Sequence, residues 1–305
     1  MDFQLEQLTG PQNPLVAIVT GSSRGFGYVL VKQLLTRGYR VVASMRDPTG
    51  ANQAARSSLE ASGAFVVDID VTRDRSVKSG VAAAVREFGH IDVLINSAGI
   101  TLTGPIEATT TNDLIRVFDV NVLGAHRMVR SVVPHMRRTG SGLILQVSSG
   151  AGRFTMPGRG CYSASKWALE AISESLRWEL ATFGIGCVIV ELGAMDTGFD
   201  IHSPEVSDTR RLRHYGPLLE TLKKDPQRLA SQMSPAIASE AMIALIEMPP
   251  VDRPIRLVRH PMAVELQKYN DQLWQLERSL LNRRGYLPLV DGATNPQEQE
   301  QGVST

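Results

Sequence analysis

The 305-residue chain has little cysteine, few aromatic residues and almost no net charge. Its two cysteines, Cys161 and Cys187, are too few for a disulfide framework, so we expect free thiols and a reducing compartment. Lys plus Arg number 32 against 31 Asp plus Glu, which leaves no basic surface for nucleic acid or anionic membranes. The first residues lack the features of a signal peptide, and no run of about 18 apolar residues predicts a membrane span. These absences favour a cytoplasmic protein with a small-molecule partner.

Histidine is also sparse, and no two of the six histidines have the spacing of two ligands on one helix face. We therefore expect no metal site. His202 and His214 fall in a segment that would border a substrate, but a solvated histidine is the favoured interpretation of each.

The chain does show a regular alternation of short β-branched runs with amphipathic stretches from Leu15 onward. This alternation is typical of parallel strands joined by crossover helices. Runs such as 16–19 and 188–190 are apolar throughout, which indicates strands covered on both faces. The sequence thus predicts an α/β fold with one doubly wound, seven-stranded parallel sheet. The expected strands are residues 15–19, 40–44, 64–69, 91–95, 142–147, 185–190 and 255–258.

A glycine-rich turn follows the first expected strand and reads Thr20-Gly21-Ser22-Ser23-Arg24-Gly25-Phe26-Gly27. Gly21 permits a sharp turn, Gly25 lets the backbone approach a pyrophosphate, and Gly27 allows close packing of helix on strand. The helix that follows supplies free amides and the positive end of a dipole. The turn predicts a dinucleotide site, and a plain β-to-α turn is the less favoured alternative.

The end of the second expected strand distinguishes between cofactors. Many dinucleotide-binding folds place an acidic residue there, which binds the adenine ribose and repels a 2′-phosphate. This chain has Arg46 instead, and a second cation, Arg24, lies in the glycine turn. Two guanidinium groups in these two loops would hold a phosphate between them, so the sequence favours NADP(H) over NAD(H).

Six separately placed motifs follow the expected strands or lie on the expected helices. They are the glycine turn, Asp70-Val71, Asn96-Ser97-Ala98-Gly99, Asn121, Ser149 and Tyr162-Ser163-Ala164-Ser165-Lys166. Over residues 13–260 these motifs resemble those of the short-chain dehydrogenase/reductase family, and residues 41–47 and 162–180 look most like the branch with 17β-hydroxysteroid and retinol dehydrogenases. The resemblance implies a Rossmann-like fold and, with the two arginines above, an NADP-dependent oxidoreductase of the carbonyl reductase or alcohol dehydrogenase type, present as a homodimer or homotetramer.

The resemblance also implies roles for residues outside the glycine turn. Asp70 and Val71 would hold the adenine, the 96–99 segment would line the ribose, and Thr197 would meet the nicotinamide carboxamide. The full set of expected cofactor-binding residues is Gly21, Ser23, Arg24, Gly25, Phe26, Gly27, Arg46, Asp70, Val71, Asn96, Ala98, Gly99, Tyr162, Lys166, Gly193 and Thr197.

Two positions depart from the family pattern. Ser97 stands where a second asparagine is usual, and its hydroxyl can still form local hydrogen bonds. Leu192 stands where a proline usually precedes the glycine at 193. Without the proline, the φ angle there is not preset, so we expect a more mobile 193–197 turn and a less certain placement of the nicotinamide.

Tyr162 and Lys166 stand four residues apart on an expected helix, which brings phenol and ammonium to one face. Hydride delivery to a ketone leaves an oxyanion that needs a proton, and a nearby ammonium lowers the pKa of a phenol from about 10. We therefore expect Tyr162 to be the acid/base and Lys166 to tune it. By the family's spacing, Ser149 rather than the adjacent Ser148 would polarise the substrate carbonyl, and Asn121 would hold a water that relays protons to Lys166.

The segments after the fifth and sixth expected strands should set specificity. Residues 152–159 include Arg153 and Arg159, and two interpretations of these arginines are equally favoured. They bind the anionic or carbonyl end of an apolar substrate, or they are solvated at the surface. The substrate contacts that we expect are Ser149, Phe154, Tyr162, Met195, Phe199 and Ile201. A lid over residues 195–235 should contain one helix, because an apolar stripe recurs there at Leu212, Tyr215, Leu218, Leu219 and Leu222.

A C-terminal amphipathic helix is expected over residues 262–284, ended by Gly285. Its stripe would pack on its own subunit or, less often, on a partner. Residues 288–305 should form a disordered tail, and the chain 1–305 should be one domain. The stripe comprises Leu266, Tyr269, Leu273, Leu276 and Leu280.

Two alternatives remain beside the oxidoreductase. A catalytically silent NADP-binding regulator should carry damaged catalytic residues, and none of the four is damaged. A sugar-nucleotide epimerase or dehydratase also has a tyrosine and a lysine four apart, but typically has two residues between the first glycines and a larger C-terminal domain.

Overall fold

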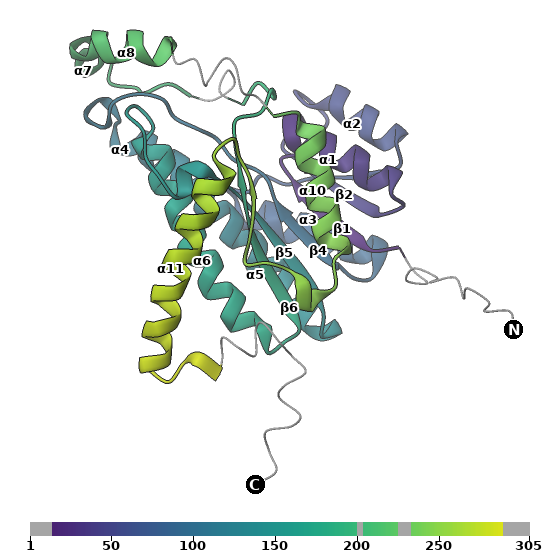
Figure 1. Ribbon diagram of the computed structural model, residues 1–305. Helices are drawn as coiled ribbons and strands as arrows, with labels where there is room; N and C mark the ends of the chain where they lie inside the picture. The colour runs from purple at the N-terminus through teal and green to yellow at the C-terminus, as the bar shows by residue number, and fades with distance from the viewer. Residues whose placement is uncertain (1–13, 200–203, 225–232, 289–305) are drawn as a thin grey trace, which may run out of the picture.

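The computed structural model describes residues 14–199, 204–224 and 233–288. Seven strands in these residues form one parallel sheet in the order β3-β2-β1-β4-β5-β6-β7 (Figure 1). This confirms the predicted doubly wound sheet, with strand ends displaced by at most two residues. The strands are β1 (Val16–Thr20), β2 (Arg40–Met45), β3 (Phe65–Asp68), β4 (Val93–Asn96), β5 (Gly142–Ser149), β6 (Ile185–Leu192) and β7 (Arg256–Arg259).

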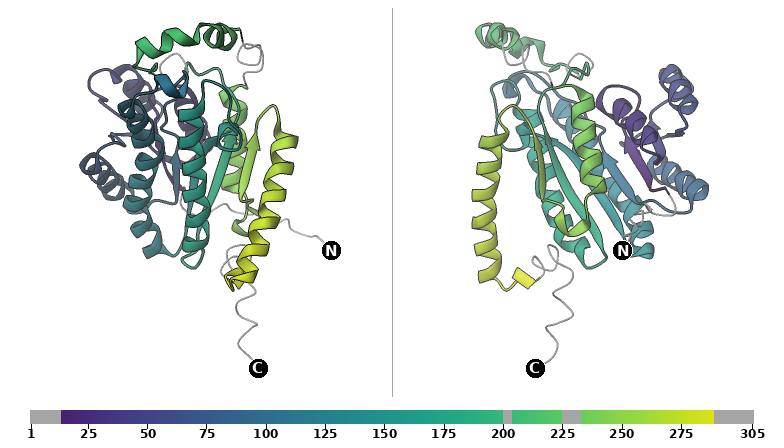
Figure 2. Two further views of the ribbon diagram at one scale, coloured as in Figure 1. Left: turned by 90° about the vertical axis from the view of Figure 1, so that its left-hand side faces the viewer. Right: turned by 45° about the vertical axis from the view of Figure 1, so that its right-hand side comes forward.

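Successive residues of β1 enter two different apolar cores. Ala17 and Val19 pack in one core with α1 (Gly25–Thr36) and α10 (Pro235–Glu247). Val16 and Ile18 pack in the other core with α3 (Asp74–Phe88) and α5 (Ala125–Thr139). All four β1 side chains are buried, as a continuous apolar run predicts for a strand covered on both faces. Figure 2 shows the sheet between these two helical layers.

The remaining helices connect and extend these layers. A π-helical segment, η2 (Asp119–Gly124), joins α4 to α5 without a break. The other α-helices are α2 (Gln53–Ala61), α4 (Thr111–Phe118), α6 (Gly160–Ala181), α7 (Thr209–Leu212), α8 (Gly216–Lys223) and α11 (Ala263–Arg283). The short 3₁₀ turns are η1 (Ile106–Ala108), η3 (Gly150–Gly152), η4 (Arg213–Tyr215) and η5 (Pro250–Asp252).

The strand order reverses between β1 and β4. From β1 the chain moves outward to β2 and β3, and it then returns to β4 and continues to β7. The carboxyl ends of β1 and β4 therefore lie side by side, at Thr20 and Asn96, and β5 ends beside them at Ser149. Such a reversal leaves a crevice outside the carboxyl ends of the strands, where open α/β sheets bind their ligands.

The segment predicted as one lid helix forms two short helices instead. The first, α7, ends at Leu212, and α8 begins at Gly216 with Pro217 in its first turn. A proline lacks the N–H and its ring clashes with the preceding turn, so a helix starts at this position rather than running through it. Both helices lie over the carboxyl ends of the strands, where Leu222 packs against Gly158 (Figure 1). Residues 200–203 and 225–232 of the predicted lid, including Ile201 and His202, lie outside the described residues.

The C-terminal helix α11 stands beside α6, where Trp274 packs on Trp178 with ring centroids 5.4 Å apart (Figure 1). Within this chain its predicted apolar stripe is only partly covered, and packing of the rest on a partner stays a prediction. Leu266 is buried, but Leu276 is 70% exposed, and Tyr269 and Leu280 are exposed as well. The helix is rotated so that a polar residue faces inward, as described below. Of the predicted tail, residues 289–305 lie outside the described residues.

Across the described part of the chain, no helix combines the length and the apolar character that crossing a bilayer requires. Cys161 and Cys187 are both buried free thiols, and burial raises their pKa values to about 11 and about 12.

Candidate active site

The glycine turn between β1 and α1 is shaped by close backbone contacts. Gly21 has a φ angle of +71°, and a Cβ there would lie 2.9 Å from the Ala98 Cα atom. Gly25 has a φ angle of +58°, and a Cβ there would lie 3.0 Å from the Thr197 Cβ atom. Gly27 packs against the Gly21 carbonyl oxygen, 2.6 Å from where its Cβ would be. The turn therefore requires glycine at each of these positions, and it lies against both the segment after β4 and the segment after β6.

The first turn of α1 can bind an anion. Its N-cap residue, Arg24, makes no capping hydrogen bond through its side chain. The amides of that first turn thus keep their donor capacity, at the positive end of the helix dipole. Ser23 is half-buried in the same turn, whereas the Phe26 side chain enters the core below it. This geometry fits the pyrophosphate of a dinucleotide.

Thr20 is a structural residue of the turn that the sequence did not identify. It is the last residue of β1 and is 1% exposed, and its Oγ1 atom accepts hydrogen bonds from the Ser97 and Ala98 amides at 3.0 Å each. Thr20 thus fixes the segment after β4 to the glycine turn. The available signal was a hydroxyl residue that ends an otherwise apolar strand directly before that turn.

Arg24 and Arg46 lie exposed at the rim of the crevice. Within the described residues, neither guanidinium forms a hydrogen bond or an ion pair through its side chain. Arg46 is close enough to Asp70 to favour its ionised form. Burial opposes that ionisation, but two hydrogen bonds from Thr72 and the charges of nearby arginines together lower the pKa of Asp70. The rim therefore offers two unpaired cations near the ends of β1 and β2.

Two of the predicted cofactor residues direct their side chains into the protein. Val71 is buried against Gly124. Asn96 is 4% exposed and donates to the Gln146 Oε1 atom at 3.0 Å, so it links β4 to β5. The buried Asn96 Oδ1 atom has no hydrogen-bond partner in the described structure. Contacts of these residues with a cofactor would come from the backbone or from this oxygen.

Helix α6 carries the predicted acid/base pair. Tyr162 is half-buried, and Lys166, one turn further along, is 5% exposed. The Lys166 Nζ atom donates to the Val147 carbonyl oxygen of β5 at 2.8 Å and lies 5.7 Å from the centre of the Tyr162 ring. Burial lowers the pKa of Lys166 to about 8, and the carboxylate of Glu170 opposes this shift. The structure thus holds a buried ammonium beside a phenol at the end of β5.

Asn121 lies in the π-helical segment and is 1% exposed. Its Nδ2 atom donates to the Ile100 carbonyl oxygen and to the Ser165 hydroxyl, and its Oδ1 atom accepts from the Ile100 amide, all at 2.9 Å. The Asn121 Oδ1 and Lys166 Nζ atoms converge on Gly99, lying 3.4 and 3.8 Å from where its Cβ would be. Asn121 therefore joins the segment after β4 to α6 at the position of the lysine.

The two adjacent serines at the end of β5 have different partners. Ser148 is buried, and its hydroxyl donates to the Glu170 Oε1 atom at 2.6 Å. Ser149 is half-buried, and its hydroxyl accepts from the Ala151 amide at 3.2 Å. Because the Ser148 hydrogen is already donated, Ser149 is the serine whose hydroxyl hydrogen remains available for a substrate.

The predicted substrate residues separate into two groups. Phe199 lies edge-on to Tyr162, with ring centroids 6.2 Å apart. Met195 follows β6 and forms an isolated bridge with Met233. Phe154 instead packs edge-on against His260, 5.8 Å away, on the β7 side. Phe199 is thus the predicted substrate residue whose ring packs against Tyr162.

Both interpretations of Arg153 were wrong, because it faces neither a substrate nor solvent. It is 8% exposed and pairs with Glu170, with Nε and Oε2 3.0 Å apart. Arg159 donates to the Thr101 Oγ1 atom at 2.8 Å. His214 is exposed, as expected for a solvated histidine.

The turn after β6 is held by the chain that follows β7. The Gly193 amide donates to the Arg259 carbonyl oxygen at 2.8 Å, and Gly193 packs against Pro261. Leu192, which replaces the usual proline, is 3% exposed in the core. Among the described residues, no group of three or more His, Cys, Asp or Glu side chains is arranged to hold a metal ion.

A family model described as short chain dehydrogenase matches residues 15–206. The chain belongs to the short-chain dehydrogenase/reductase family. It is therefore a hydride-transfer oxidoreductase, and the resemblance inferred from the six motifs is confirmed.

Three similar proteins illustrate this membership. Oxidoreductase BOA17 of Botryotinia fuckeliana (strain B05.10) is 34% identical over 250 residues, covering 81% of this chain and 89% of that protein. The 17-beta-hydroxysteroid dehydrogenase type 1 of Mus musculus is 36% identical over 194 residues, covering 61% and 56%. The crystal structure of a short-chain dehydrogenase from Streptomyces avermitilis has a TM-score of 0.76 and 29% identity, covering 90% of this chain and 98% of that one.

Proposed function

We propose that the protein transfers hydride between NADP(H) and a ketone, aldehyde or secondary alcohol of largely apolar character, with Tyr162 as the acid/base. The observation that carries the proposal is the arrangement on α6, where the buried Lys166 ammonium lies beside the Tyr162 phenol at the end of β5. A dehydrogenase of this kind needs a group that exchanges a proton with the substrate oxygen. A phenol next to a fixed positive charge meets that need, because the charge favours the phenolate form.

Three residues of the crevice have separate roles in the proposed reaction. When bound, NADPH supplies the hydride for reduction of a carbonyl, and NADP⁺ accepts the hydride in oxidation of an alcohol. Ser149 donates a hydrogen bond to the substrate oxygen and stabilises its developing negative charge. Tyr162 gives its proton to that oxygen in reduction and removes it in oxidation. Lys166, held by the Val147 carbonyl oxygen, places its positive charge beside the phenol.

The glycine turn, the 96–99 segment and Thr197 together fit a dinucleotide, and the rim favours NADP(H). Arg24 and Arg46 are exposed cations in the two loops that meet the adenine ribose in this fold. A 2′-phosphate would give both a partner through charge-assisted hydrogen bonds. Asp70 is the nearby carboxylate, but it lies after β3 and is bonded to Thr72.

An apolar substrate is supported by Phe199, whose ring lies against Tyr162 and is 38% exposed. The name of the mouse relative also indicates a hydroxysteroid, which is a large apolar alcohol. Helices α7 and α8 lie over the same end of the sheet, where they would shield a bound substrate from water.

Titration of the purified protein with NADPH and NADH, followed by a panel of steroid, retinoid, aryl and quinone carbonyls, tests the proposal. We expect NADPH to bind more tightly and at least one carbonyl to drive its oxidation, observed through the cofactor absorbance. NADPH binding without turnover of any carbonyl would favour the silent regulator. Failure to bind either cofactor would refute the assigned nucleotide site.

A further inference from the structure

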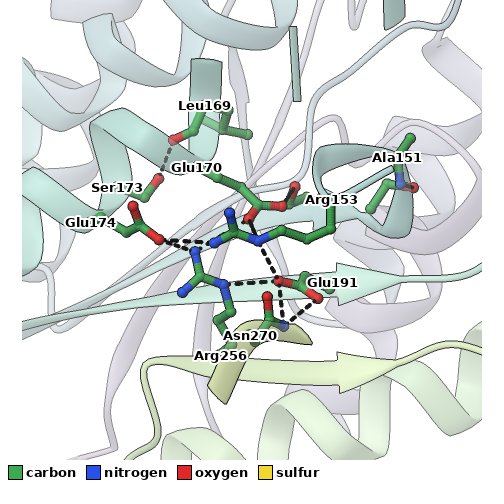
Figure 3. A network of polar contacts seen from close by, with 11 residues as sticks. Ala151, Arg153, Leu169, Glu170, Ser173, Glu174, Glu191, Arg256 and Asn270 are labelled. Atoms are coloured by element: carbon green, nitrogen blue, oxygen red, sulfur yellow. Dashed lines mark hydrogen bonds and ion pairs between the residues drawn. The ribbon is translucent and has the colours of Figure 1, made fainter. Parts of the chain in front are cut away.

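A network of buried charged side chains begins one helical turn beyond Lys166 on α6, and no step of the proposed reaction uses it. Figure 3 shows its members converging from α6, β6, β7, α11 and the turn after η3. The side chains of Glu191, Glu170 and Arg153 are only 0%, 1% and 5% exposed. The network comprises Arg153, Glu170, Glu174, Glu191, Arg256 and Asn270.

Two guanidinium groups contact three carboxylates in this network. Arg153 pairs with Glu170 at 3.0 Å, Arg256 pairs with Glu191 at 2.9 Å, and both arginines also pair with Glu174. Asn270 of α11 donates to both carboxylate oxygens of Glu191, at 3.0 and 3.1 Å. Burial of so many charges carries a large desolvation cost, so the network is weak evidence for added stability.

Glu170 joins this network to the candidate active site. Its Oε1 atom accepts the hydrogen bond of the Ser148 hydroxyl at 2.6 Å, and its carboxylate packs against Gly152. Ser149 lies between these two contacts along the chain, and its own hydroxyl accepts from the Ala151 amide. The carboxylate therefore holds the backbone on both sides of Ser149 against α6, the helix that carries Tyr162 and Lys166.

We propose that Glu170 is a positioning residue for the reaction: it holds Ser149 at a fixed place relative to Tyr162 and stabilises the ammonium of Lys166 one helical turn away. This inference rests on the proposed function. Arg153 and Arg256 hold the Glu170 carboxylate in place. The Arg153 Nε and Arg256 Nη2 atoms lie 3.0 and 3.4 Å from the Glu170 Oε2 atom.

The groups around Lys166 leave Glu170 as its one carboxylate neighbour among the described residues. Tyr162 and Glu170 stand one helical turn before and after it on α6, the Val147 carbonyl oxygen accepts its hydrogen bond from β5, and the Asn121 amide lies nearby in η2. Glu170 in turn is faced by Ser148 of β5, Arg153 after η3, Glu174 of α6, Glu191 of β6 and Arg256 of β7.

Lys166 and Glu170 stand one helical turn apart in a buried site, and this proximity couples their charges. Burial lowers the pKa of Lys166 to about 8 and raises the pKa of Glu170 to about 8, the latter against the pull of Arg153. Once Glu170 has ionised, its negative charge makes Lys166 harder to deprotonate. Removal of that carboxylate should therefore shift the titration of Lys166 to lower pH.

The experiment compares Glu170→Gln with the matched control Glu174→Gln. Both replace a network carboxylate of α6 by an amide of the same shape, but Glu174 lies two turns from Lys166 and does not bind Ser148. The chain has six lysines, so ¹³C NMR of the lysine ε-carbons can follow Lys166 by pH titration, with Lys166→Arg for assignment. We expect Glu170→Gln to lower the Lys166 midpoint by about one pH unit and Glu174→Gln, which acts on Lys166 only through Glu170, to shift it much less. Equal midpoints in the two variants would overturn the proposal.

Ser148→Ala provides a second test, which also serves if Glu170→Gln does not fold. It removes the hydrogen bond to Glu170 and leaves every charge in place. We expect kcat to fall about tenfold or more while the KM for NADPH stays unchanged, because Ser149 loses its fixed position. A wild-type kcat in Ser148→Ala would overturn the positioning role. If the wild-type protein reduces no carbonyl, the proposed function fails, whereas the Lys166 titration still decides the role of Glu170.

Discussion

The Lys166 ammonium donates a hydrogen bond to the Val147 carbonyl oxygen at 2.8 Å from a side chain that is 5% exposed. This bond fixes α6 to the end of β5, two residues before Ser149. It also places the charge where water cannot solvate it, and burial lowers the pKa of Lys166 to about 8. The ammonium beside Tyr162, which we propose tunes this phenol, therefore titrates near physiological pH.

The first prediction concerns the pH dependence of carbonyl reduction. Below about pH 8 Lys166 carries its proton, and its positive charge stabilises the phenolate that Tyr162 becomes when it gives its proton to the substrate. Above this pH Lys166 becomes neutral and this stabilisation is lost. We expect kcat/KM for reduction to fall as pH rises through about 8, which steady-state rates between pH 6 and 10 would show. Loss of activity only near the usual lysine pKa of about 10.4 would contradict the role of burial.

Tyr162→Phe should separate catalysis from cofactor binding. The variant loses only the hydroxyl that exchanges a proton with the substrate oxygen, so kcat should fall by about 100-fold or more. The Kd for NADPH should stay within a few-fold, measured by fluorescence titration. Tyr39→Phe is the control, because Tyr39 precedes β2 at the amino ends of the strands, opposite the crevice, and it should keep wild-type kcat. Equal losses in catalysis and in NADPH affinity for Tyr162→Phe would contradict the assignment.

Thr20→Val should destabilise the cofactor crevice. The substitution keeps the side-chain shape but leaves the Ser97 and Ala98 amides without their acceptor. Urea unfolding should show a loss of about 2 kcal/mol or more, since an unsatisfied buried donor costs about 1–3 kcal/mol.

Thr20→Ser keeps the hydroxyl and should lose less than about 1 kcal/mol, the value of one methyl group. NADPH affinity should decrease in Thr20→Val and not in Thr20→Ser, because the 97–98 segment is held by that oxygen. Two variants of equal stability would show that the hydroxyl plays no such part.

The parts of the fold that local pattern determines were predictable. The apolar run 16–19 predicted a strand with helices on both faces, and both of its faces are buried in the structure. The glycine turn was found because close backbone contacts permit no side chain at Gly21 or Gly25. In both cases the sequence signal is local, although the contacts that require glycine in the turn come from Ala98 and Thr197, far along the chain.

The buried network behind Glu170 could not be predicted in this way. Arg153 stands in a glycine-rich loop that resembles a surface loop, and its partners come from α6 and β6, between 17 and 38 positions further along the chain. The orientation of α11 depends on the same partners, because Asn270 must reach Glu191. A stripe of leucines gives the period of a helix, but buried polar contacts decided which face turned inward.

Arg46→Ala should weaken NADPH binding and leave NADH binding unchanged, because only NADPH carries the 2′-phosphate. Loss of a charge-assisted contact of about 1.5–3 kcal/mol corresponds to a Kd for NADPH about 10- to 100-fold higher. Arg24→Ala should act in the same direction. Arg130→Ala on α5 is the control, since α5 covers the other face of the sheet from α1. Equal weakening of NADPH and NADH by Arg46→Ala would refute the phosphate site.

Phe199→Ala should change which carbonyls the enzyme accepts. The Phe199 ring lies 6.2 Å from the Tyr162 ring and is 38% exposed, so it offers apolar surface beside the reacting oxygen. A large apolar carbonyl that covers this ring should show a KM about tenfold higher in the variant, which corresponds to about 1.4 kcal/mol of lost burial. A small carbonyl should not be affected. Phe183→Ala, at a phenylalanine of 39% exposure just before β6, should change neither KM. If large and small carbonyls lose affinity equally in Phe199→Ala, the ring supports the loop rather than the substrate.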